Sequence, residues 1–499
     1  MNVRLEPTLD LHAVADWLIV PMFADAIEPG ELWLNQELKG QIARLRESGD
    51  WKADLHTQLA LYPESCVAAK RILLAGLGTP SALTLDALLR LGTQLGKSIA
   101  QRAWPRIRCM LPSQWGQLTA SQALFNLALG FIKGCHSPAL KQKEVKRFAP
   151  NELLFYSFIN DDQEPFRESL QRAHVVGQAV NLTRDLVNEP PSDLTPAQFA
   201  ERCSTEANRH GFQCDILDQT RIASNKMNCL LSVAKGSAEP PRVVVLRYGH
   251  GSPCLGFVGK GVTFDSGGLS LKTNEQMIDM KCDMAGAATV LGAFTAIAQL
   301  QLPGSFLGVL ALVENMPGPN ALKLGDVLSA RTGKTIEVLN TDAEGRLILA
   351  DALDYAIEQK ADRLIDLATL TGACMVALGT DVAGLFSNAP DWQLQVKACA
   401  EAVGEKVWPM PMFKEYGELL KSQVADIKNV GGKFAGAITA AKFLEHFVGE
   451  TPWVHLDIAG PAFASEDSAS RDTGGTGAYV ATLVELARQW PDYRQSLKA

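Results

Sequence analysis

The chain has 499 residues, of which 47% are hydrophobic and 20% charged, and its formal net charge is −8. A single hydrophobic core stops growing at about 250–300 residues, so this length predicts two domains. The acidic balance disfavours nucleic acid or an anionic membrane as the main partner, because both require a clustered basic surface.

Residues 1–150 contain short apolar runs that alternate with helical periodicity. The runs at 17–22 and 71–78 predict buried strands, and apolar residues three or four apart predict a helix within 83–102. This alternation is typical of a small α/β domain with a largely parallel sheet. Because residues 1–150 carry no cluster of chemistry-bearing side chains, we expect a structural or assembly role for them.

Residues 151–190 are predicted to be a linker and a connecting helix. The stretch 136–165 is polar and contains several prolines, and a helix is expected from Phe166 to about Val187. Consecutive prolines at 190–191 end that helix. A new helix then starts with a proline in its first turn, and a catalytic domain is expected over 191–499.

From residue 240 onward, strands alternate with helices again. β-branched content and length predict strands at 243–246, 256–258, 306–313, 335–339, 363–367 and 454–458. Helical periodicity predicts helices at 285–300, 347–358 and 436–447. The fold class predicted for the whole chain is therefore α/β, with a larger C-terminal domain built on a mainly parallel sheet flanked by helices.

One chemistry-bearing segment spans residues 257–272, where a strand is expected to run into a glycine-rich loop holding Lys260, Asp265 and Lys272. In folds of this kind, ligands bind beyond the carboxyl ends of the strands. A phosphate-binding P-loop is disfavoured, because the four-residue gap and the following Ser or Thr are missing. Alone, the segment is also compatible with a tight loop that carries solvated lysines.

A second segment, 280–288, places Asp283 where a helix N-cap is expected, and capping alone would explain this aspartate. Small residues after Asp283 would permit a close approach by another part of the protein.

A third segment, residues 340–347, reads NTDAEGRL. Thr341 and Glu344 have the spacing of a capping box, but Gly345 weakens a helix start and capping does not explain Asp342. An Asp, a Glu and an Arg within five residues at a strand end indicate a site.

The three segments together supply four carboxylates and three cations. The carboxylates are Asp265, Asp283, Asp342 and Glu344, and the cations are Lys260, Lys272 and Arg346. Converging carboxylates repel one another unless metal neutralises them, and two divalent ions would balance these four. Oxygen ligands suit Mn²⁺ or Mg²⁺, and Zn²⁺ also accepts carboxylates. All eight histidines lie outside the segments, which argues against an H-E-x-x-H protease.

These segments resemble the leucyl aminopeptidase family, the cytosol aminopeptidases of peptidase family M17. Residues 340–347 match that family's signature octapeptide without a substitution. The resemblance covers roughly 180–490, including 188–196, 366–373, 425–429 and 455–461. Residues 1–150 resemble the family only in position and α/β character.

The resemblance implies two divalent metal ions per subunit, Mn²⁺ or Zn²⁺ or else Mg²⁺. Asp265, Asp342 and Glu344 would hold one ion, with the Asp342 carbonyl, and Lys260, Asp265, Asp283 and Glu344 would hold the other. Lys260 must then be a neutral amine, with a pKa well below its ordinary value of about 10.4.

The resemblance also implies hydrolysis of the N-terminal residue of a peptide by a metal-bridging water or hydroxide, with a leucine-like preference. Lys272 would stabilise the oxyanion, and Arg346 would anchor a bicarbonate that serves as general base. The expected substrate contacts, for which packing beside a buried strand is the alternative, are Met280, Thr369, Leu370 and Gly372.

The expected partners are peptides with a free N-terminus and further copies of the chain in a homohexamer. No membrane partner is expected, because no apolar run reaches about 20 residues. Ten cysteines without a C-x-x-C pair suggest reduced, mostly buried thiols, and with no signal peptide pattern they predict a cytoplasmic protein. The alternatives are a relative that has lost catalysis or one with a binding or DNA-regulatory role.

Overall fold

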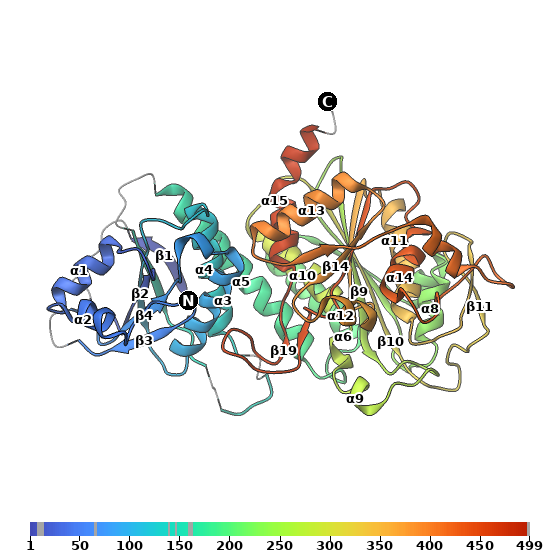
Figure 1. The fold of residues 1–499 in the computed structure, drawn as a ribbon. Helices are drawn as coiled ribbons and strands as arrows, with labels where there is room; N and C mark the ends of the chain where they lie inside the picture. Colours follow the sequence, from blue (N-terminus) through green and yellow to red (C-terminus); the bar gives the residue numbers. More distant parts are fainter. Residues whose placement is uncertain (7–13, 64–66, 138–139, 145–146, 158–162, 497–499) are drawn as a thin grey trace. The chain divides into compact units, whose positions relative to one another are not determined.

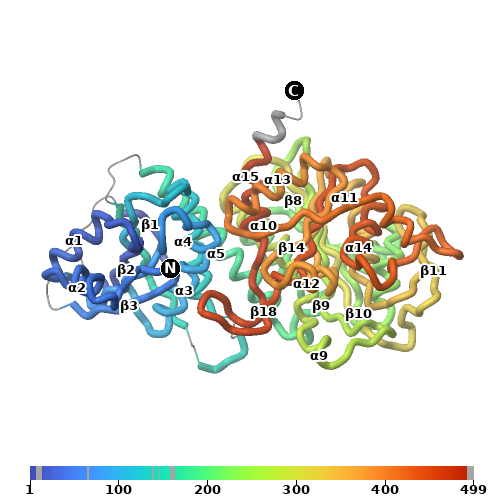
Figure 2. The backbone as a smooth tube through the Cα atoms, viewed as in Figure 1, coloured from blue at the N-terminus to red at the C-terminus, as the bar shows by residue number. Residues whose placement is uncertain are grey.

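The computed structural model describes residues 1–6, 14–63, 67–137, 140–144, 147–157 and 163–496. The backbone, drawn as a tube in Figure 2, divides into two compact units. The first unit comprises Met1–Gln178, Ala402–Gly404 and Asp467–Arg471, and the second comprises the rest of the chain. Within the described ranges, no helix has the length and apolarity that a membrane span requires.

The first unit contains a six-stranded sheet in the order β1-β6-β5-β2-β4-β3. Its strands are β1 (Asn2–Glu6), β2 (Trp17–Met22), β3 (Gln58–Leu61), β4 (Ile72–Gly76), β5 (Arg106–Met110) and β6 (Glu152–Tyr156). All neighbours are parallel except β3 and β4. The helices are α1 (Pro29–Glu37), α2 (Gln41–Ser48), α3 (Leu85–Ile99), α4 (Ala120–Cys135) and the 3₁₀ turn η1 (Pro80–Ala82).

Helices α1 and α2 cover one face of this sheet, and α3 and α4 cover the other (Figure 1). Glycines let α3 and α4 approach closely. An added Cβ at Gly92 would lie 2.1 Å from the carbonyl oxygen of Leu127, and one at Gly130 would lie 2.1 Å from that of Leu89. No side chain fits in either space, so these glycines set the distance between the two helices.

The strands predicted at 17–22 and 71–78 and the helix predicted within 83–102 are confirmed as β2, β4 and α3. The expected linker differs, because it contains β6, which pairs with both β1 and β5 inside the sheet. Strand β6 has five residues and is flanked by polar sequence, so its apolar pattern is easily missed in the sequence. The connecting helix is present as α5 (Glu164–Asn188).

The second unit is built on an eight-stranded sheet in the order β15-β14-β17-β13-β9-β10-β8-β7. Its strands are β7 (Gln213–Leu217), β8 (Arg242–Gly249), β9 (Leu255–Asp265), β10 (Ser305–Asn315), β13 (Arg363–Ala368), β14 (Ala383–Ser387), β15 (Val407–Pro409) and β17 (Trp453–Asp457). The four central strands, from β17 to β10, run parallel. Short pairings join β11 (Val327–Ser329), β12 (Thr335–Glu337) and β16 (Ile427–Lys428), and join β18 (Phe463–Ala464) with β19 (Gly474–Gly475).

Helices cover both faces of this larger sheet (Figure 1). On one face lie α6 (Pro196–His210), α10 (Ala285–Gln299) and α15 (Val480–Ser496), and on the other lie α8 (Asn228–Ala234), α11 (Glu344–Glu358) and α14 (Gly436–Glu445). The remaining helical elements are α7 (Gln219–Ser224), α9 (Asn274–Met277), η2 (Met280–Cys282), α12 (Gly372–Leu378), α13 (Pro390–Ala402) and η3 (Lys414–Leu420). The predicted α/β architecture with a mostly parallel sheet is confirmed.

The strand predicted at 256–258 is longer than expected. β9 continues to Asp265, so Lys260 lies on a strand and not in a glycine-rich loop. β9 pairs along its length with β10 and over its first half with β13, and these two ladders keep it extended despite its glycines. Glycine is also required here, because a Cβ at Gly259 would lie 2.6 Å from the Cα of Ala287 on α10.

The nine cysteines in the described ranges are free thiols, and all but Cys214 are buried. This agrees with the expectation of reduced, mostly buried cysteines. Cys66 lies outside the described residues.

Asp351 is a fully buried carboxylate on α11 that organises the core around it. It accepts hydrogen bonds from the backbone N–H of Leu230 at 3.1 Å and of Arg331 at 2.8 Å. Burial raises the pKa of Asp351 to about 7, against the opposing effect of these hydrogen bonds.

We predict a pH-dependent stability contribution from Asp351. Its pKa in the unfolded chain is about 3.9, so between that value and about 7 the folded state binds the extra proton. Its contribution is therefore greatest below pH 4 and declines as the pH rises toward 7. In urea denaturation, the wild type should gain stability relative to Asp351→Asn as the pH falls through this range. A difference that does not change with pH would contradict the prediction.

Candidate active site

The four predicted carboxylates meet at the end of the larger sheet where the central strand β9 stops. Asp265 ends β9, Asp283 follows η2 directly before α10, and Asp342 and Glu344 lie at the start of α11. Single oxygens of Asp265, Asp342 and Glu344 all lie within 4.8 Å of one another. Because these residues come from three separate segments, the fold brings together the groups whose convergence the sequence predicts.

Lys260 lies among the carboxylates. Its ammonium nitrogen is 2.8 Å from Oδ1 of Asp283 and 2.9 Å from Oε1 of Glu344. It also donates a hydrogen bond of 2.9 Å to the carbonyl of Thr369. Gly345 permits this packing, because a Cβ there would lie 2.6 Å from the Lys260 side chain.

Lys272 bridges the other two carboxylates. Its ammonium nitrogen is 2.9 Å from Oδ2 of Asp265 and 2.5 Å from Oδ1 of Asp342. Asp342 is the most exposed of the four acids, with 34% of its side chain accessible. Lys272 therefore lies on the side of the cluster that solvent or a substrate can reach.

The acidic groups have perturbed protonation equilibria. Burial raises the pKa of Asp283 well above its usual range, against the opposing attraction of Lys260. Burial and the charge of Asp265 likewise raise the pKa of Glu344 and of Asp342. Such shifts are typical of sites where like charges have been forced together.

The pKa values of the two lysines are raised as well, and for a lysine this favours the charged form. Burial disfavours their charge, but the surrounding carboxylates outweigh it and raise the pKa of both Lys260 and Lys272. A neutral Lys260 amine requires a lowered pKa. The carboxylates alone do not provide that shift, so it would depend on the positive charge of bound metal ions.

The donor set fits divalent metal ions. Among the described residues, Oδ2 of Asp283 and Oε2 of Glu344 are buried without a hydrogen-bond partner. A buried carboxylate oxygen without a partner is costly, and a hard cation removes that cost by coordination. Carboxylate oxygens with one amine nitrogen suit Mn²⁺, Mg²⁺ or Zn²⁺.

Helix capping, the alternative explanation for these acids, does not hold. The residue that caps α10 is Met284, and Asp283 makes no capping hydrogen bond. α11 begins at Glu344, and the Thr341 hydroxyl donates to the carbonyl of Gly267 at 2.7 Å instead of forming a capping box. The predicted N-cap at Asp283 was therefore wrong, and the acid is free for another role.

Arg346 lies in the first turn of α11 and is buried. One of its N–H groups donates to the carbonyl of Asn429 at 2.7 Å, and its Nε has no partner among the described residues. Burial lowers the pKa of Arg346 to about 10, so the guanidinium stays charged at neutral pH. A buried guanidinium with a spare donor can bind a small planar anion.

The predicted substrate residues occupy two short elements. Thr369 touches the cluster directly, because its hydroxyl donates to Oδ1 of Asp283 at 2.8 Å. Leu370 follows it half-buried, and Gly372 opens α12 with no atom within 4 Å of an added Cβ. Met280 opens η2, three residues before Asp283, and is half-buried.

Two functional-site residues were not anticipated from the sequence. Asn315 ends β10 beside Asp265, and its amide donates to Oδ1 of Asp265 at 2.8 Å and to the carbonyl of Thr341 at 3.0 Å. Asn429 binds the backbone of Asn340 through its side chain and Arg346 through its carbonyl. A polar residue directly after the apolar run of β10 was the available signal for Asn315.

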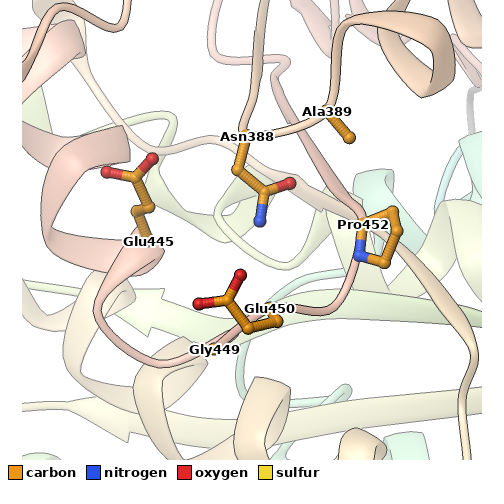
Figure 3. Close-up of a pocket in the computed structure, with 6 residues that line it drawn as sticks. All are labelled: Asn388, Ala389, Glu445, Gly449, Glu450 and Pro452. Carbon is orange, nitrogen blue, oxygen red and sulfur yellow. The ribbon is translucent and has the colours of Figure 1, made fainter.

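A separate polar cavity of about 350 Å³ lies near the start of β17, at the sheet edge opposite the cluster (Figure 3). Asn388, Glu445 and Glu450 face this space. The Asn388 amide is occupied by the backbone of Thr451 and Trp453, so it serves the fold. The cavity is not part of the carboxylate site.

A carboxylate cluster at the carboxyl ends of parallel strands places this protein in the class of metal-dependent α/β enzymes. The chain belongs to the cytosol aminopeptidase family, whose catalytic domain matches residues 181–484 and whose N-terminal domain matches residues 19–140. The predicted family and enzyme class are thus confirmed: the protein is an aminopeptidase, a metallo-exopeptidase hydrolase.

Curated relatives and solved structures agree with this assignment. A "Probable cytosol aminopeptidase" of Rhodopirellula baltica is 46% identical, over 83% of this chain and 80% of that protein. Another with that name, from Alkaliphilus metalliredigens, is 38% identical over 96% and 97%.

Among solved structures, a mutant of tomato leucine aminopeptidase superposes with a TM-score of 0.88 at 34% identity, over 98% of this chain and 96% of that one. The bottromycin maturation enzyme BotP in complex with Mn gives a TM-score of 0.85 at 33% identity, over 96% and 100%.

We predict that Mn²⁺ stabilises the chelator-treated protein. A ligand that binds only the folded state adds about 2.7 kcal/mol at a hundred times its Kd, so the unfolding temperature should rise. Glu344→Gln should lose most of this rise, whereas Glu401→Gln, an exposed acid on α13, should keep it. Thermal denaturation with and without Mn²⁺ measures both. Equal rises in the two variants would remove Glu344 from the metal site.

Proposed function

We propose that the protein removes the N-terminal residue of peptides at a two-metal site formed by Lys260, Asp265, Asp283, Asp342 and Glu344. The observation that carries this proposal is the convergence of four carboxylates with buried, unpaired oxygens among them. Membership of the cytosol aminopeptidase family supplies the reaction class, and the cluster supplies the place.

Each metal position has its own ligand set in this proposal. Asp265, Asp342 with its carbonyl, and Glu344 would hold one ion, and the carboxylate oxygens of these three acids lie together. Lys260, Asp265, Asp283 and Glu344 would hold the other, so Asp265 and Glu344 would serve both. When bound, such a pair supplies an activated water and polarises the scissile carbonyl. Mn²⁺ or Zn²⁺, or else Mg²⁺, satisfies this donor set.

Two cations take part in the proposed cleavage of the peptide bond. Lys272, on the reachable side of the cluster, donates a hydrogen bond to the oxyanion that develops on the scissile carbonyl. Arg346 would hold a bicarbonate, which would supply the general base of the reaction. The spare donor of its buried guanidinium supports that role.

The substrate is held next to these groups. Thr369, Leu370 and Gly372 form the turn beside Asp283, and Met280 contributes an apolar wall for the first side chain. An apolar wall favours leucine-like residues at the N-terminus. A free α-amine is required, because it would take a ligand position that a blocked terminus cannot fill.

The proposed enzyme also has a compartment and an oligomeric state. We place it in the cytoplasm, because its relatives are named cytosol aminopeptidases. We also propose a homohexamer in which residues 1–150 serve assembly, residues 151–190 connect and residues 191–499 catalyse. Sedimentation at six times the chain mass of 53.9 kDa would support this assembly, and a monomer would contradict it.

The direct test of the proposed function is hydrolysis of leucine p-nitroanilide with added Mn²⁺. We expect turnover that is lost with a chelator and restored by the metal, and no turnover of N-acetyl-leucine p-nitroanilide. The absorbance of the released p-nitroaniline is the readout. Equal hydrolysis of both substrates would reject an exopeptidase, and no hydrolysis with any divalent metal would favour a relative that has lost catalysis.

The proposed ligands are tested by conservative changes. Asp342→Asn and Glu344→Gln should abolish turnover with an unchanged circular dichroism spectrum, because each amide removes a negative ligand without changing size. Arg346→Met should lower turnover by about 10²–10³, the usual cost of removing a preorganised group. The matched control, Glu401→Gln, should hydrolyse normally. Near-wild-type rates in folded Asp342→Asn would remove that residue from the site.

A further inference from the structure

We infer that Asp457 is a positioning residue of the active site. Its carboxylate holds the turn at residues 369–371 in the place from which Thr369 orients Lys260 and Asp283. The inference rests on the proposed function of these residues as metal ligands. It concerns a side chain outside the proposed metal ligands, and its effect on Lys260 and Asp283 passes through the turn.

Asp457 ends β17 and is fully buried. Its Oδ1 accepts hydrogen bonds from the backbone N–H of Leu370 at 3.2 Å and of Thr371 at 3.4 Å. Its Oδ2 accepts a shorter bond of 2.6 Å from the Thr371 hydroxyl. The backbone N–H of Ala459 completes the set at 3.2 Å. Three of these four donors belong to two consecutive residues of the turn.

Sheet pairing brings this carboxylate to the turn. β17 and β13 are parallel, and their last residues, Asp457 and Ala368, are partners in the ladder. The next N–H, from Ile458, still bonds the carbonyl of Ala368 at 2.9 Å. Beyond that point the chain after β13 has no strand to pair with, and the Asp457 side chain takes the place of the ladder.

The turn transmits this anchoring to the cluster through one residue. Thr369 accepts a hydrogen bond from Lys260 on its carbonyl, and its hydroxyl donates to Asp283. In the proposed ligand sets, Lys260 and Asp283 belong only to the second metal position, whereas Asp342 belongs only to the first. A shift of the turn would therefore move that half of the site and leave Asp342 unaffected.

The same anchor sets the start of α12. The Thr371 hydroxyl that donates to Asp457 also accepts from the N–H of Cys374 at 3.0 Å, as the N-cap of that helix. One hydroxyl thus joins a buried carboxylate to the helix whose first residue is Gly372. Groups of this kind, which orient a ligand without being one, typically alter metal affinity or activity 10–100-fold when removed.

The test uses Thr371, because removing Asp457 itself would leave several buried N–H groups unpaired and risks unfolding. Thr371→Val keeps the shape and deletes the donor to Asp457, and Thr371→Ser keeps the donor. Thr295→Val is the matched control, since it deletes another buried hydroxyl, on α10, that bonds only the carbonyl of Gly292. Urea denaturation compares the stability of all three variants.

Mn²⁺ affinity of the chelator-treated protein, measured by calorimetry, is the main readout. Thr371→Val should bind one of two Mn²⁺ ions, the one at the position with Lys260 and Asp283, about 10–100-fold less tightly than the wild type, and Thr371→Ser should restore binding. Turnover of leucine p-nitroanilide should fall at limiting Mn²⁺ and recover with excess Mn²⁺. Thr295→Val should lose stability only.

Three outcomes would overturn the inference. In the first, Thr371→Val binds Mn²⁺ as the wild type does; in the second, Thr371→Ser fails to rescue; in the third, Thr295→Val loses Mn²⁺ affinity to the same degree. Each of these, with an active wild type, leaves the proposed function intact. A wild type that neither binds Mn²⁺ nor hydrolyses the substrate would overturn the proposed function, and the inference with it.

Discussion

Four carboxylates buried within a few ångströms of one another repel strongly, and the structure holds them together with only two ammonium groups. Lys260 sits between Asp283 and Glu344, and Lys272 lies between Asp265 and Asp342. Two of the negative charges have no ammonium partner, and burial, together with the repulsion between the acids, raises the pKa of Asp283 and Glu344. Such an arrangement lowers the stability of the fold, and bound positive charge would offset that cost. We therefore interpret the cluster as a site for cations.

The fold resists this repulsion by taking two of the four acids from regular elements and holding the turns that carry Asp283 and Asp342 next to them. Asp265 ends a strand that is paired on both sides, and Glu344 begins a fully packed helix. Small residues allow the elements to approach closely enough: a Cβ at Gly286 would lie 2.0 Å from the carbonyl of Leu367. Asn315 holds the end of β10 to Asp265, and Asp457 holds the turn after β13. These contacts keep the acids from moving apart when no metal ion is bound.

The sequence predicted five of the eight strands of the larger sheet, which are β8, β9, β10, β13 and β17, and the acids that meet beside it, because apolar periodicity and the octapeptide around Asp342 are local signals. It did not predict β7, β14 or β15. It did not predict β6, whose short apolar run becomes a strand only by pairing with β1 and β5. Nor did it place Lys260 on a strand, since two ladders override the glycines. Asn315 and Asp457 were missed for a related reason, because Asp265 and Thr371, which they bind in the site, lie 50 and 86 residues away along the chain.

The most direct test of this account is anomalous diffraction at the manganese edge from crystals of the chelator-treated protein soaked in Mn²⁺. The account predicts two adjacent peaks, one among Asp265, Asp342 and Glu344 and the other among Lys260, Asp265, Asp283 and Glu344. Both peaks should disappear in Glu344→Gln, because that acid contributes to each position. Ordered density for the four acids with no anomalous peak between them, or peaks only elsewhere, would contradict it.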